Sequence, residues 1–257
     1  TVAHGGLWLP EAGWVQPGRL CHSLRDHPAI TVIENSVSAL HQSDRGWVLC
    51  DPAGEPILTA DHVIIANGLN SRQYPQTSWQ PLRPKRGQIT ALAAPPDAGP
   101  ACITTFGHYL SPVIDGRRVL GATYDRWENT VPAVWPDAQD DSDTANREAL
   151  AAAMPGLAIS LENVIDRRAA LRATTPDHLP LAGPALVTGE GGVEGYHGGL
   201  FLLTGLGSTG LVTAPICAEL LCAQLFDEPS PLAAQTARAV LPKRFLERAA
   251  KRGVPVT

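Results

Sequence analysis

The residues best placed to do chemistry lie in a glycine-rich turn in the C-terminal half of the chain. Gly205, Gly207 and Gly210 fall within six residues. They follow the apolar run Leu200–Leu203, which predicts a buried strand, and a helical pattern begins within residues 208–213. A strand, a tight turn and a helix leave free backbone N–H groups and the positive end of the helix dipole at the turn. The sequence therefore predicts a corner that attracts negative charge.

Two enzymatic interpretations of this corner fit poorly. The spacing from Gly205 to Gly210 matches the dinucleotide pattern G-x-G-x-x-G, which requires a second strand and an acidic residue about 20 positions later. Here Asp227 is followed at once by a proline-containing segment, and no second parallel strand is evident. Ser208 as a nucleophile would need a glycine at position 206 and a histidine later in the chain. Leu206 occupies that position, and no histidine comes after residue 197.

A third interpretation places the corner against the electron-rich pyrimidine edge of a flavin, where a helix N-terminus stabilises the charge that develops on reduction. The alternative is a turn that only allows the helix to pack on the sheet. The local sequence does not separate these two possibilities. Apolar residues along two neighbouring faces predict that the helix is largely buried; they are Val212, Ile216 and Leu220 on one face and Cys217, Leu221 and Leu225 on the next.

The composition indicates a soluble globular protein. With 257 residues, 44% of them hydrophobic and 18% charged, the chain can bury one large core or two small ones. No apolar run approaches the length of a membrane span, and the N-terminus lacks signal-peptide features. The odd number of cysteines, five without C-x-x-C spacing, indicates core thiols in a reducing cytoplasm. The eight histidines are scattered, which gives little support for a metal site.

A net charge of −5 hides a basic C-terminal segment, residues 238–252. Such a segment can bind phosphates, as nucleic-acid-binding surfaces do, or it can be a solvated terminal helix. Its only acidic residue is Glu247, and its basic residues are Arg238, Lys243, Arg244, Arg248, Lys251 and Arg252.

Periodicity and turn residues predict a mixed α/β fold with a parallel and an antiparallel sheet. In the N-terminal part we expect a hairpin near 1–17, a helix over 18–25 opened by Pro17, a strand at 30–33, and antiparallel strands at 46–50 and 55–59. The strand over 62–68 should pair in parallel with 200–204. Later in the chain we expect short antiparallel strands at 86–91, 108–113 and 118–124, a helix over 144–154 capped by residues 141–143, an extended segment at 164–173, and a glycine loop at 190–199.

The corner and several further motifs together resemble the D-amino-acid-oxidase-like FAD-dependent oxidoreductases. Within this family the match is closest to the MnmC-like group, the C-terminal oxidase half of bifunctional enzymes that make 5-methylaminomethyl-2-thiouridine in tRNA. The match covers nearly the whole chain in the same order. The segments that carry it are residues 9–17, 63–68, 109–112, 120–126, 172–183, 206–221, 227–232 and 241–245.

The resemblance implies a flavin-binding domain, residues 1–82 and 178–257 with the leading hairpin from the substrate domain, and an antiparallel substrate domain, residues 83–177. It also implies site residues, although Val37 could equally be plain core and Arg86 could form an ion pair. The implied set is Val37 beside the adenosine, Ala66, Asn67 and Gly68 near the dinucleotide, Arg86 and Gly87 near the flavin ring, Gly205, Gly207, Ser208, Thr209, Gly210 and Leu211 at the pyrimidine edge, Arg172 on a substrate carboxylate, and Tyr109 lining the pocket.

The chemistry implied by the resemblance is hydride transfer from the C–H beside a secondary amine to FAD, followed by hydrolysis of the imine and reoxidation by O₂. The implied substrate is carboxymethylaminomethyl-(2-thio)uridine in tRNA, which is converted to the aminomethyl form. Implied partners are tRNA, through the basic segment, and an N-terminal methyltransferase domain. Two alternatives remain open: a glycine- or sarcosine-oxidase-like enzyme for a free amino acid, and a flavin-free fragment that acts as an interaction module.

The chain departs from the family pattern at two places. The family's G-x-G-x-x-G, which precedes the substrate domain, is missing, so the sequence resembles the C-terminal part of a longer protein. Our hypothesis is that the complete gene product binds FAD whereas this piece alone binds it poorly. In addition, Thr209 stands where relatives usually carry an arginine, and threonine cannot hold a carboxylate in a bidentate manner.

Overall fold

The computed structural model describes residues 5–128, 136–157, 163–189 and 192–253, and their contacts divide the chain into two units. The antiparallel unit contains residues 5–27, 85–128 and the described residues between 136 and 171. The corner unit contains residues 28–84 and the described residues from 172 to 253. Residues 5–27 therefore cluster with the antiparallel unit, and the sequence-based division likewise assigned the segment near 1–17 to the substrate domain.

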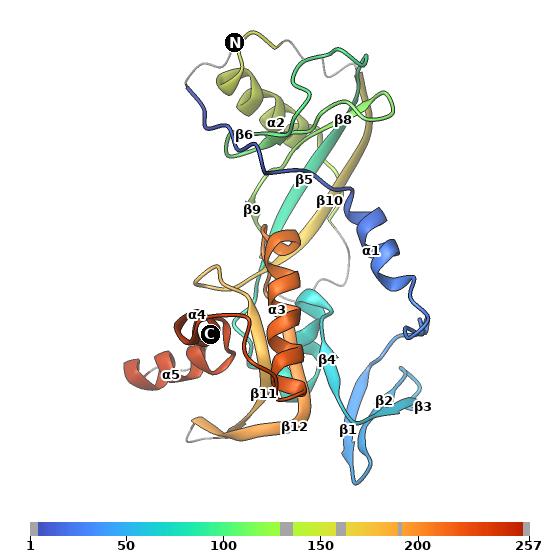
Figure 1. Cartoon of the computed structure of the whole chain (residues 1–257), viewed down its shortest axis with the longest axis vertical. Helices are drawn as coiled ribbons and strands as arrows, with labels where there is room; N and C mark the ends of the chain where they lie inside the picture. Colours follow the sequence, from blue (N-terminus) through green and yellow to red (C-terminus); the bar gives the residue numbers. More distant parts are fainter. Residues whose placement is uncertain (1–4, 129–135, 158–162, 190–191, 254–257) are drawn as a thin grey trace. The chain divides into compact units, whose positions relative to one another are not determined.

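The antiparallel unit is built on one sheet with the strand order β10-β5-β8-β7-β6, and β9 pairs with β5 (Figure 1). Helix α2 packs on this sheet through a core of Leu92, Leu110, Leu120, Leu150 and Met154. The predicted short strands are therefore confirmed as an antiparallel set. The elements are α1 (Pro17–Arg25), β5 (Arg83–Ala93), β6 (Thr104–Thr105), β7 (Tyr109–Leu110), β8 (Arg117–Gly121), β9 (Asp125–Arg126), α2 (Asp140–Ala153) and β10 (Val164–Thr174).

The corner unit contains two three-stranded sheets, β1-β2-β3 and β11-β12-β4. Strands β12 and β4 are parallel, with Leu200 opposite Val63 and Leu202 opposite Ile65, which confirms the predicted pairing. Helix α3 packs against β11 and β12 (Figure 1). The elements are β1 (Ala39–Ser43), β2 (Gly46–Cys50), β3 (Pro56–Ala60), β4 (Val63–Ile65), η1 (Gly68–Gln73), η2 (Pro75–Thr77), β11 (Leu181–Gly189), β12 (Gly192–Thr204), α3 (Gly210–Leu225), α4 (Ala234–Val240) and α5 (Lys243–Arg252).

Among the described residues of the corner unit, two hydrophobic clusters lie around its sheets. One joins the two sheets, and in it the indole Nε1 of Trp47 donates to the Gly198 carbonyl at 2.8 Å. The other packs α3 and α4 on β11 through Ala182, Cys217, Leu220 and Val240. A proline inside the basic C-terminal segment predicts a break in the terminal helix, since proline lacks the N–H that a continuous helix would need, and Pro242 does separate α4 from α5.

Two strand predictions in the first 33 residues are wrong. Residues 30–33 form no strand, and the side chains of Ile30, Val32 and Ile33 are exposed. Strand propensity reflects packing against neighbours, and this segment pairs with no strand in the described part of the chain. Of the hairpin expected near 1–17, residues 1–4 lie outside the described residues, and residues 5–17 form only a turn, in which the Ala12 N–H donates to the Leu9 carbonyl at 3.1 Å.

Further corrections concern the central elements. Residues 192–199, expected as a loop, belong to β12 because β11 supplies a partner along this length, which overrides the low strand propensity of glycine. Helix α2 begins at Asp140, so Ser142 and Asp143 lie in its first turn instead of capping it. Helix α3 is buried only in its second half, since Leu211 is 49% and Val212 79% exposed.

Candidate functional site

The candidate site lies at the carboxyl ends of the parallel strands β4 and β12. Ala66, Asn67 and Gly68 follow β4, and the glycine corner, residues 205–211, follows β12. The hydroxyl of Thr204 donates to the Gly68 carbonyl at 3.0 Å and thereby joins the two loops. In open α/β sheets, ligands bind outside this edge. The structure thus brings together two of the predicted groups of cofactor-binding residues.

The corner can form because two of its glycines adopt left-handed backbone conformations. Gly205 has φ +68° and Gly207 has φ +59°. A Cβ atom added at Gly205 would lie 2.7 Å from Cγ2 of Thr175, so no side chain fits there without movement. The Gly207 N–H donates to the Ala173 carbonyl at 2.9 Å. The turn therefore packs tightly against residues 173–175.

The N-terminus of α3 offers unused hydrogen-bond donors. No side chain caps this 16-residue helix, its first turn has no acidic residue, and the Thr209 hydroxyl donates to the Leu206 carbonyl at 3.4 Å. Within the described residues, the amides of Ser208, Gly210 and Leu211 have no hydrogen-bond acceptor. Open amides at the positive end of a helix dipole suit an anion or the electron-rich edge of a ring.

Val37 is connected to the same edge through Tyr74. The Val37 carbonyl accepts hydrogen bonds from Tyr74 Oη at 3.1 Å and Gln73 Nε2 at 2.9 Å, and its side chain packs against the core. The Asn67 side-chain amide donates to Tyr74 Oη at 3.5 Å. Tyr74 and Thr204 tie the predicted residues together, although neither stands in a motif that marks it in the sequence. A role for Val37 beside an adenosine stays a prediction.

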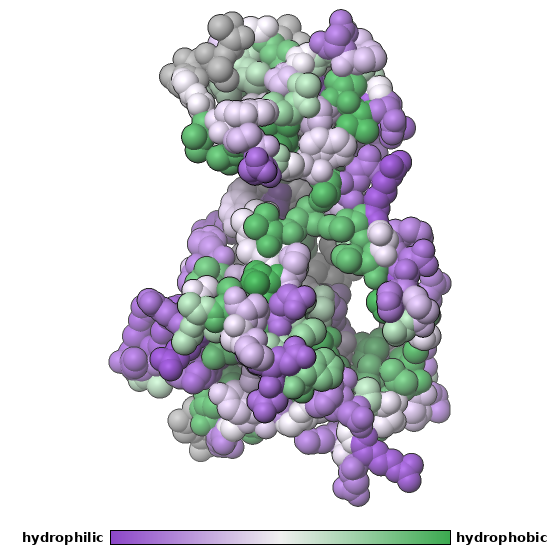
Figure 2. Space-filling view, in the orientation of Figure 1, coloured by the Kyte–Doolittle hydropathy of each residue, from purple (hydrophilic) through white to green (hydrophobic). Residues whose placement is uncertain are grey.

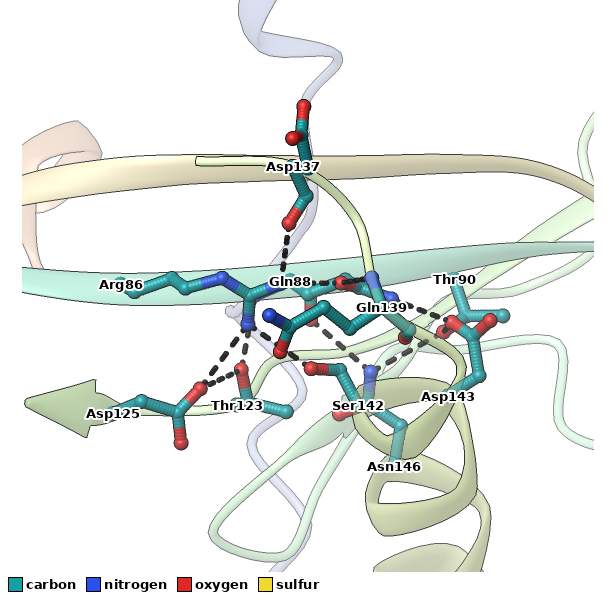
Figure 3. A network of polar contacts seen from close by, with 10 residues as sticks. All are labelled: Arg86, Gln88, Thr90, Thr123, Asp125, Asp137, Gln139, Ser142, Asp143 and Asn146. Carbon is teal, nitrogen blue, oxygen red and sulfur yellow. Dashed lines mark hydrogen bonds and ion pairs between the residues drawn. The ribbon is translucent and has the colours of Figure 1, made fainter. Parts of the chain in front are cut away.

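Arg86 and Gly87 lie on β5 in the antiparallel unit, where Arg86 is the centre of a buried polar network (Figure 3). Its side chain is almost fully buried, and its two Nη atoms make four hydrogen bonds. The acceptors are Asp125 Oδ2 (3.3 Å), Ser142 Oγ (3.0 Å), Gln88 Oε1 (2.7 Å) and the Asp137 carbonyl (2.8 Å). Approach to a flavin ring stays a prediction, while the ion pair with Asp125 is present.

The same network fixes the first turn of α2 on the sheet. The Gln88 amide donates to the Gln139 carbonyl at 2.8 Å and to Asp143 Oδ1 at 2.9 Å, and its oxygen accepts the Gln139 N–H at 2.7 Å. Asn146 donates to the Gln88 carbonyl at 3.1 Å. Asp143 also forms an ion pair with Arg167 of β10. Figure 3 shows these polar contacts between β5 and the first turn of α2. The main role of the network is therefore to fix the orientation of α2 on the sheet.

The two residues expected to contact substrate belong to different units. Tyr109 lies half-buried on β7, opposite Thr105 and Gly121. Arg172 lies half-buried on β10, next to the residues that support the glycine corner. Their roles in carboxylate binding and pocket lining stay predictions.

A carboxylate that lies in one of the resemblance segments, but to which the sequence assigned no role, is found in the loop before β11. Asp177 receives two hydrogen bonds from Arg244 of α5, at 2.9 and 3.0 Å, and one from Arg248 at 2.6 Å. Burial raises the pKa of Asp177, but the hydrogen bonds from the two arginines outweigh it and hold the pKa well below 3.8. Two of the six basic residues in the C-terminal segment are thus engaged in an internal ion pair.

Asp177 is expected to make the protein sensitive to acid. Because its pKa is depressed in the folded state, its contribution to stability is present above pH 3.8 and is lost as the pH falls towards the folded-state pKa. Asp177→Asn should therefore unfold with a flatter dependence of the free energy on pH below 3.8. Urea unfolding across this range tests it, with the exposed Asp61→Asn as control. If the free energy of unfolding of Asp177→Asn falls as steeply with decreasing pH as that of the unmodified protein, Asp177 is not the source of the acid sensitivity.

The described residues hold no group of three or more histidine, cysteine or acidic side chains suited to a metal ion. All five cysteines are free thiols. No helix in the described ranges is long and apolar enough to cross a membrane.

Comparison with known proteins agrees with this geometry. A family model described as "FAD dependent oxidoreductase" (DAO) matches residues 2–224. The bifunctional tRNA 5-methylaminomethyl-2-thiouridine biosynthesis protein MnmC of Chromobacterium violaceum is 36% identical over 95% of the chain, and that of Marinobacter nauticus is 38% identical over 91%. The chain spans 40% and 37% of the length of these relatives, respectively.

Among solved structures, iminodiacetate oxidase from Chelativorans sp. BNC1 matches with a TM-score of 0.62 and 23% identity. Glycine oxidase from Geobacillus kaustophilus matches with a TM-score of 0.61 and 18% identity. Each match covers 81% of this chain and about half of the other chain (53% and 52%). These likenesses show the fold, which is the predicted mixed α/β fold of a small parallel pair and a larger antiparallel sheet.

Proposed function

Since the chain belongs to the family of FAD-dependent oxidoreductases, we propose that it is the oxidase part of an enzyme that converts carboxymethylaminomethyl-(2-thio)uridine in tRNA to the aminomethyl form. The observation that carries the proposal is the open set of amides at Ser208, Gly210 and Leu211, at the carboxyl edge of β4 and β12. The substrate is suggested by the relatives, whose printed name assigns them to 5-methylaminomethyl-2-thiouridine synthesis.

The residues at this edge fit a flavin. Bound FAD would supply two-electron oxidation of the C–H bond next to the substrate amine. The corner amides would hold the electron-rich pyrimidine edge, while Ala66, Asn67 and Gly68 would lie along the dinucleotide. We propose that Arg172 holds the substrate carboxylate and that Tyr109 lines the pocket. The Thr209 hydroxyl donates to the Leu206 carbonyl, and threonine adds no positive charge for binding the substrate carboxylate.

The decisive experiment supplies the chain with excess FAD, O₂ and tRNA that carries the carboxymethylaminomethyl group. Excess FAD is needed because we expect the chain alone to bind it weakly. The expected products are aminomethyl-uridine in the tRNA, seen by nucleoside mass spectrometry, and glyoxylate from the removed carboxymethyl group. Oxidation of free sarcosine or glycine without tRNA turnover would favour the amino-acid oxidase alternative. Absence of saturable flavin binding would favour the flavin-free fragment.

A test of tRNA binding by the basic segment must choose cations that are free of internal contacts. Arg244 is buried, and both Arg244 and Arg248 bind Asp177, so replacing these two by alanine would break an internal ion pair as well as remove surface charge. A hydrophilic surface covers α5 (Figure 2), and the exposed cations of the segment that make no ion pair are Arg238, Lys251 and Arg252.

Replacing these three exposed cations by alanine is expected to lower the slope of log affinity against log salt by about 2–3, because each lost phosphate contact lowers it by roughly 0.7–0.9. Filter binding of tRNA over a salt series measures this slope. A control with the same charge change replaces the exposed Arg45, Arg126 and Arg168. Equal slopes for the two triple variants would show that the basic segment is not part of the tRNA-binding surface.

A further inference from the structure

We propose that Arg244 is a positioning residue for the glycine corner, which it holds in place through Asp177 and the loop 175–179. That the corner holds a flavin rests on the proposed function. The coupling between Arg244 and the corner is argued only from contacts within this chain. It assigns the C-terminal helices a role at the site, although α5 contributes no residue to the corner.

The first link is the guanidinium of Arg244, which is 5% exposed. Its five N–H groups match five hydrogen bonds in the structure. Nε and Nη2 bind the two oxygens of Asp177, and Nη2 also donates to the Leu179 carbonyl at 2.8 Å. Nη1 donates to the carbonyls of Val240 and Leu241, at 2.9 and 3.1 Å. One side chain therefore joins the end of α4 to the loop before β11.

The second link is the loop itself. Asp177 Oδ1 accepts the Leu179 N–H at 3.2 Å and lies 3.1 Å from the Thr175 hydroxyl. The Thr175 hydroxyl is also 2.7 Å from the Leu179 carbonyl. His178, between these groups, has φ +61°, a left-handed conformation that is unfavourable for a non-glycine residue and needs support from its surroundings. The Arg244–Asp177 pair supplies that support.

The third link joins the loop to the corner. Thr175 is 1% exposed, and its Cγ2 fills the space where a Cβ of Gly205 would lie. Next to it, Thr174 forms an isolated antiparallel β-bridge with Leu206, and the Ala173 carbonyl accepts the Gly207 N–H. The backbone from 173 to 175 is thus the surface against which the corner is shaped. A shift of Thr175 would change the direction of the amides that follow Gly205.

Arg244→Lys tests this coupling because it keeps the positive charge but removes the two-pronged contact with Asp177. The readout is amide hydrogen exchange of the flavin-free protein. We expect exchange at Gly207 and Thr209, the two corner amides that donate hydrogen bonds, to rise at least about tenfold, while residues 39–50 of β1 and β2 in the same unit keep their rates. Arg248→Lys is the matched control on the same helix. It leaves the Arg244 contacts intact and should leave both regions unchanged.

A purely structural role would give a different pattern. If Arg244→Lys accelerates both regions equally, or leaves the corner unchanged, the proposal is overturned. Thr175→Val provides a second variant in case Arg244→Lys does not fold. It removes the hydroxyl contacts yet keeps a methyl group beside Gly205, and it should selectively accelerate the corner as well. A uniform or absent effect would count against the coupling in the same way.

Failure of this proposal can be told apart from failure of the proposed function. Exchange is measured without flavin, so it decides the coupling even if FAD never binds. In a parallel FAD titration, Arg244→Lys should weaken binding while Arg248→Lys should not. If the unmodified protein shows no saturable FAD binding, the proposed function fails and the exchange result still stands.

Discussion

Arg86→Met is expected to lower the free energy of unfolding of the antiparallel unit by about 3 kcal/mol, the lower end of the range for breaking a buried ion pair. The lower end applies because the partner, Asp125, is half-exposed and can be hydrated. Removal of the guanidinium leaves Ser142 Oγ and the Asp137 carbonyl without their donor, and the Gln88 oxygen keeps only the Gln139 N–H. Unsatisfied buried acceptors cost free energy that a methionine side chain of similar length does not return.

Urea denaturation of the Arg86→Met variant measures this effect. Arg117→Met is the matched control, because Arg117 lies on the neighbouring strand β8 with an exposed side chain. The control should change stability by less than about 0.5 kcal/mol. If Arg86→Met unfolds like the control but loses FAD affinity, then Arg86 serves the flavin ring and the network is not what holds α2.

Gly205→Ala is expected to abolish the geometry of the corner, whereas Gly207→Ala should weaken it only moderately. Both positions have positive φ, so an alanine at either costs about 1–2 kcal/mol of backbone strain. Only the alanine at 205 meets Thr175 Cγ2 at 2.7 Å and Leu82 Cδ2 at 3.3 Å. At 207 the nearest atom is 3.7 Å away, which is ordinary contact.

The difference between these two variants isolates the steric contribution. Overpacking typically costs about 1–3 kcal/mol, which corresponds to a further loss of FAD affinity of roughly fivefold to 150-fold for Gly205→Ala. Flavin fluorescence titration of both variants measures the ratio. Equal affinities would mean that the close contact between Gly205 and Thr175 does not shape the flavin site.

The features that the sequence predicts correctly are those set by local patterns. Apolar runs at 63–65 and 200–203 marked two strands that pair in parallel as predicted, although the first is less buried than expected, with Ile64 43% exposed. Pro17 and Pro242 set helix boundaries because proline acts through its own ring and missing N–H. The glycine spacing at 205–210 located the corner because left-handed turns favour glycine.

The features that the sequence did not predict depend on partners distant in the chain. Residues 30–33 have strand propensity but no strand beside them, and residues 192–199 lack propensity yet pair along β11. The ion pair between Asp177 and Arg244 joins residues 67 positions apart. No local pattern indicates such a pair. The sequence therefore suggested that all the basic residues of the C-terminal segment are either solvated or available to bind tRNA.

The candidate site was predicted in part. The family resemblance implied residues 66–68 and 205–211, and the structure places both segments at one edge because loops that follow parallel strands meet there. The side chains that join them, Thr204 and Tyr74, depend on packing that only the folded chain shows.

The most direct test of the central claim is a titration of the ¹⁵N-labelled chain with FAD, followed at the amides of Ser208, Gly210 and Leu211. The account predicts that these three signals, with those of residues 66–68, show the largest saturable shifts. Saturable flavin binding that leaves these amides unchanged, or no saturable binding at excess FAD, would contradict the account.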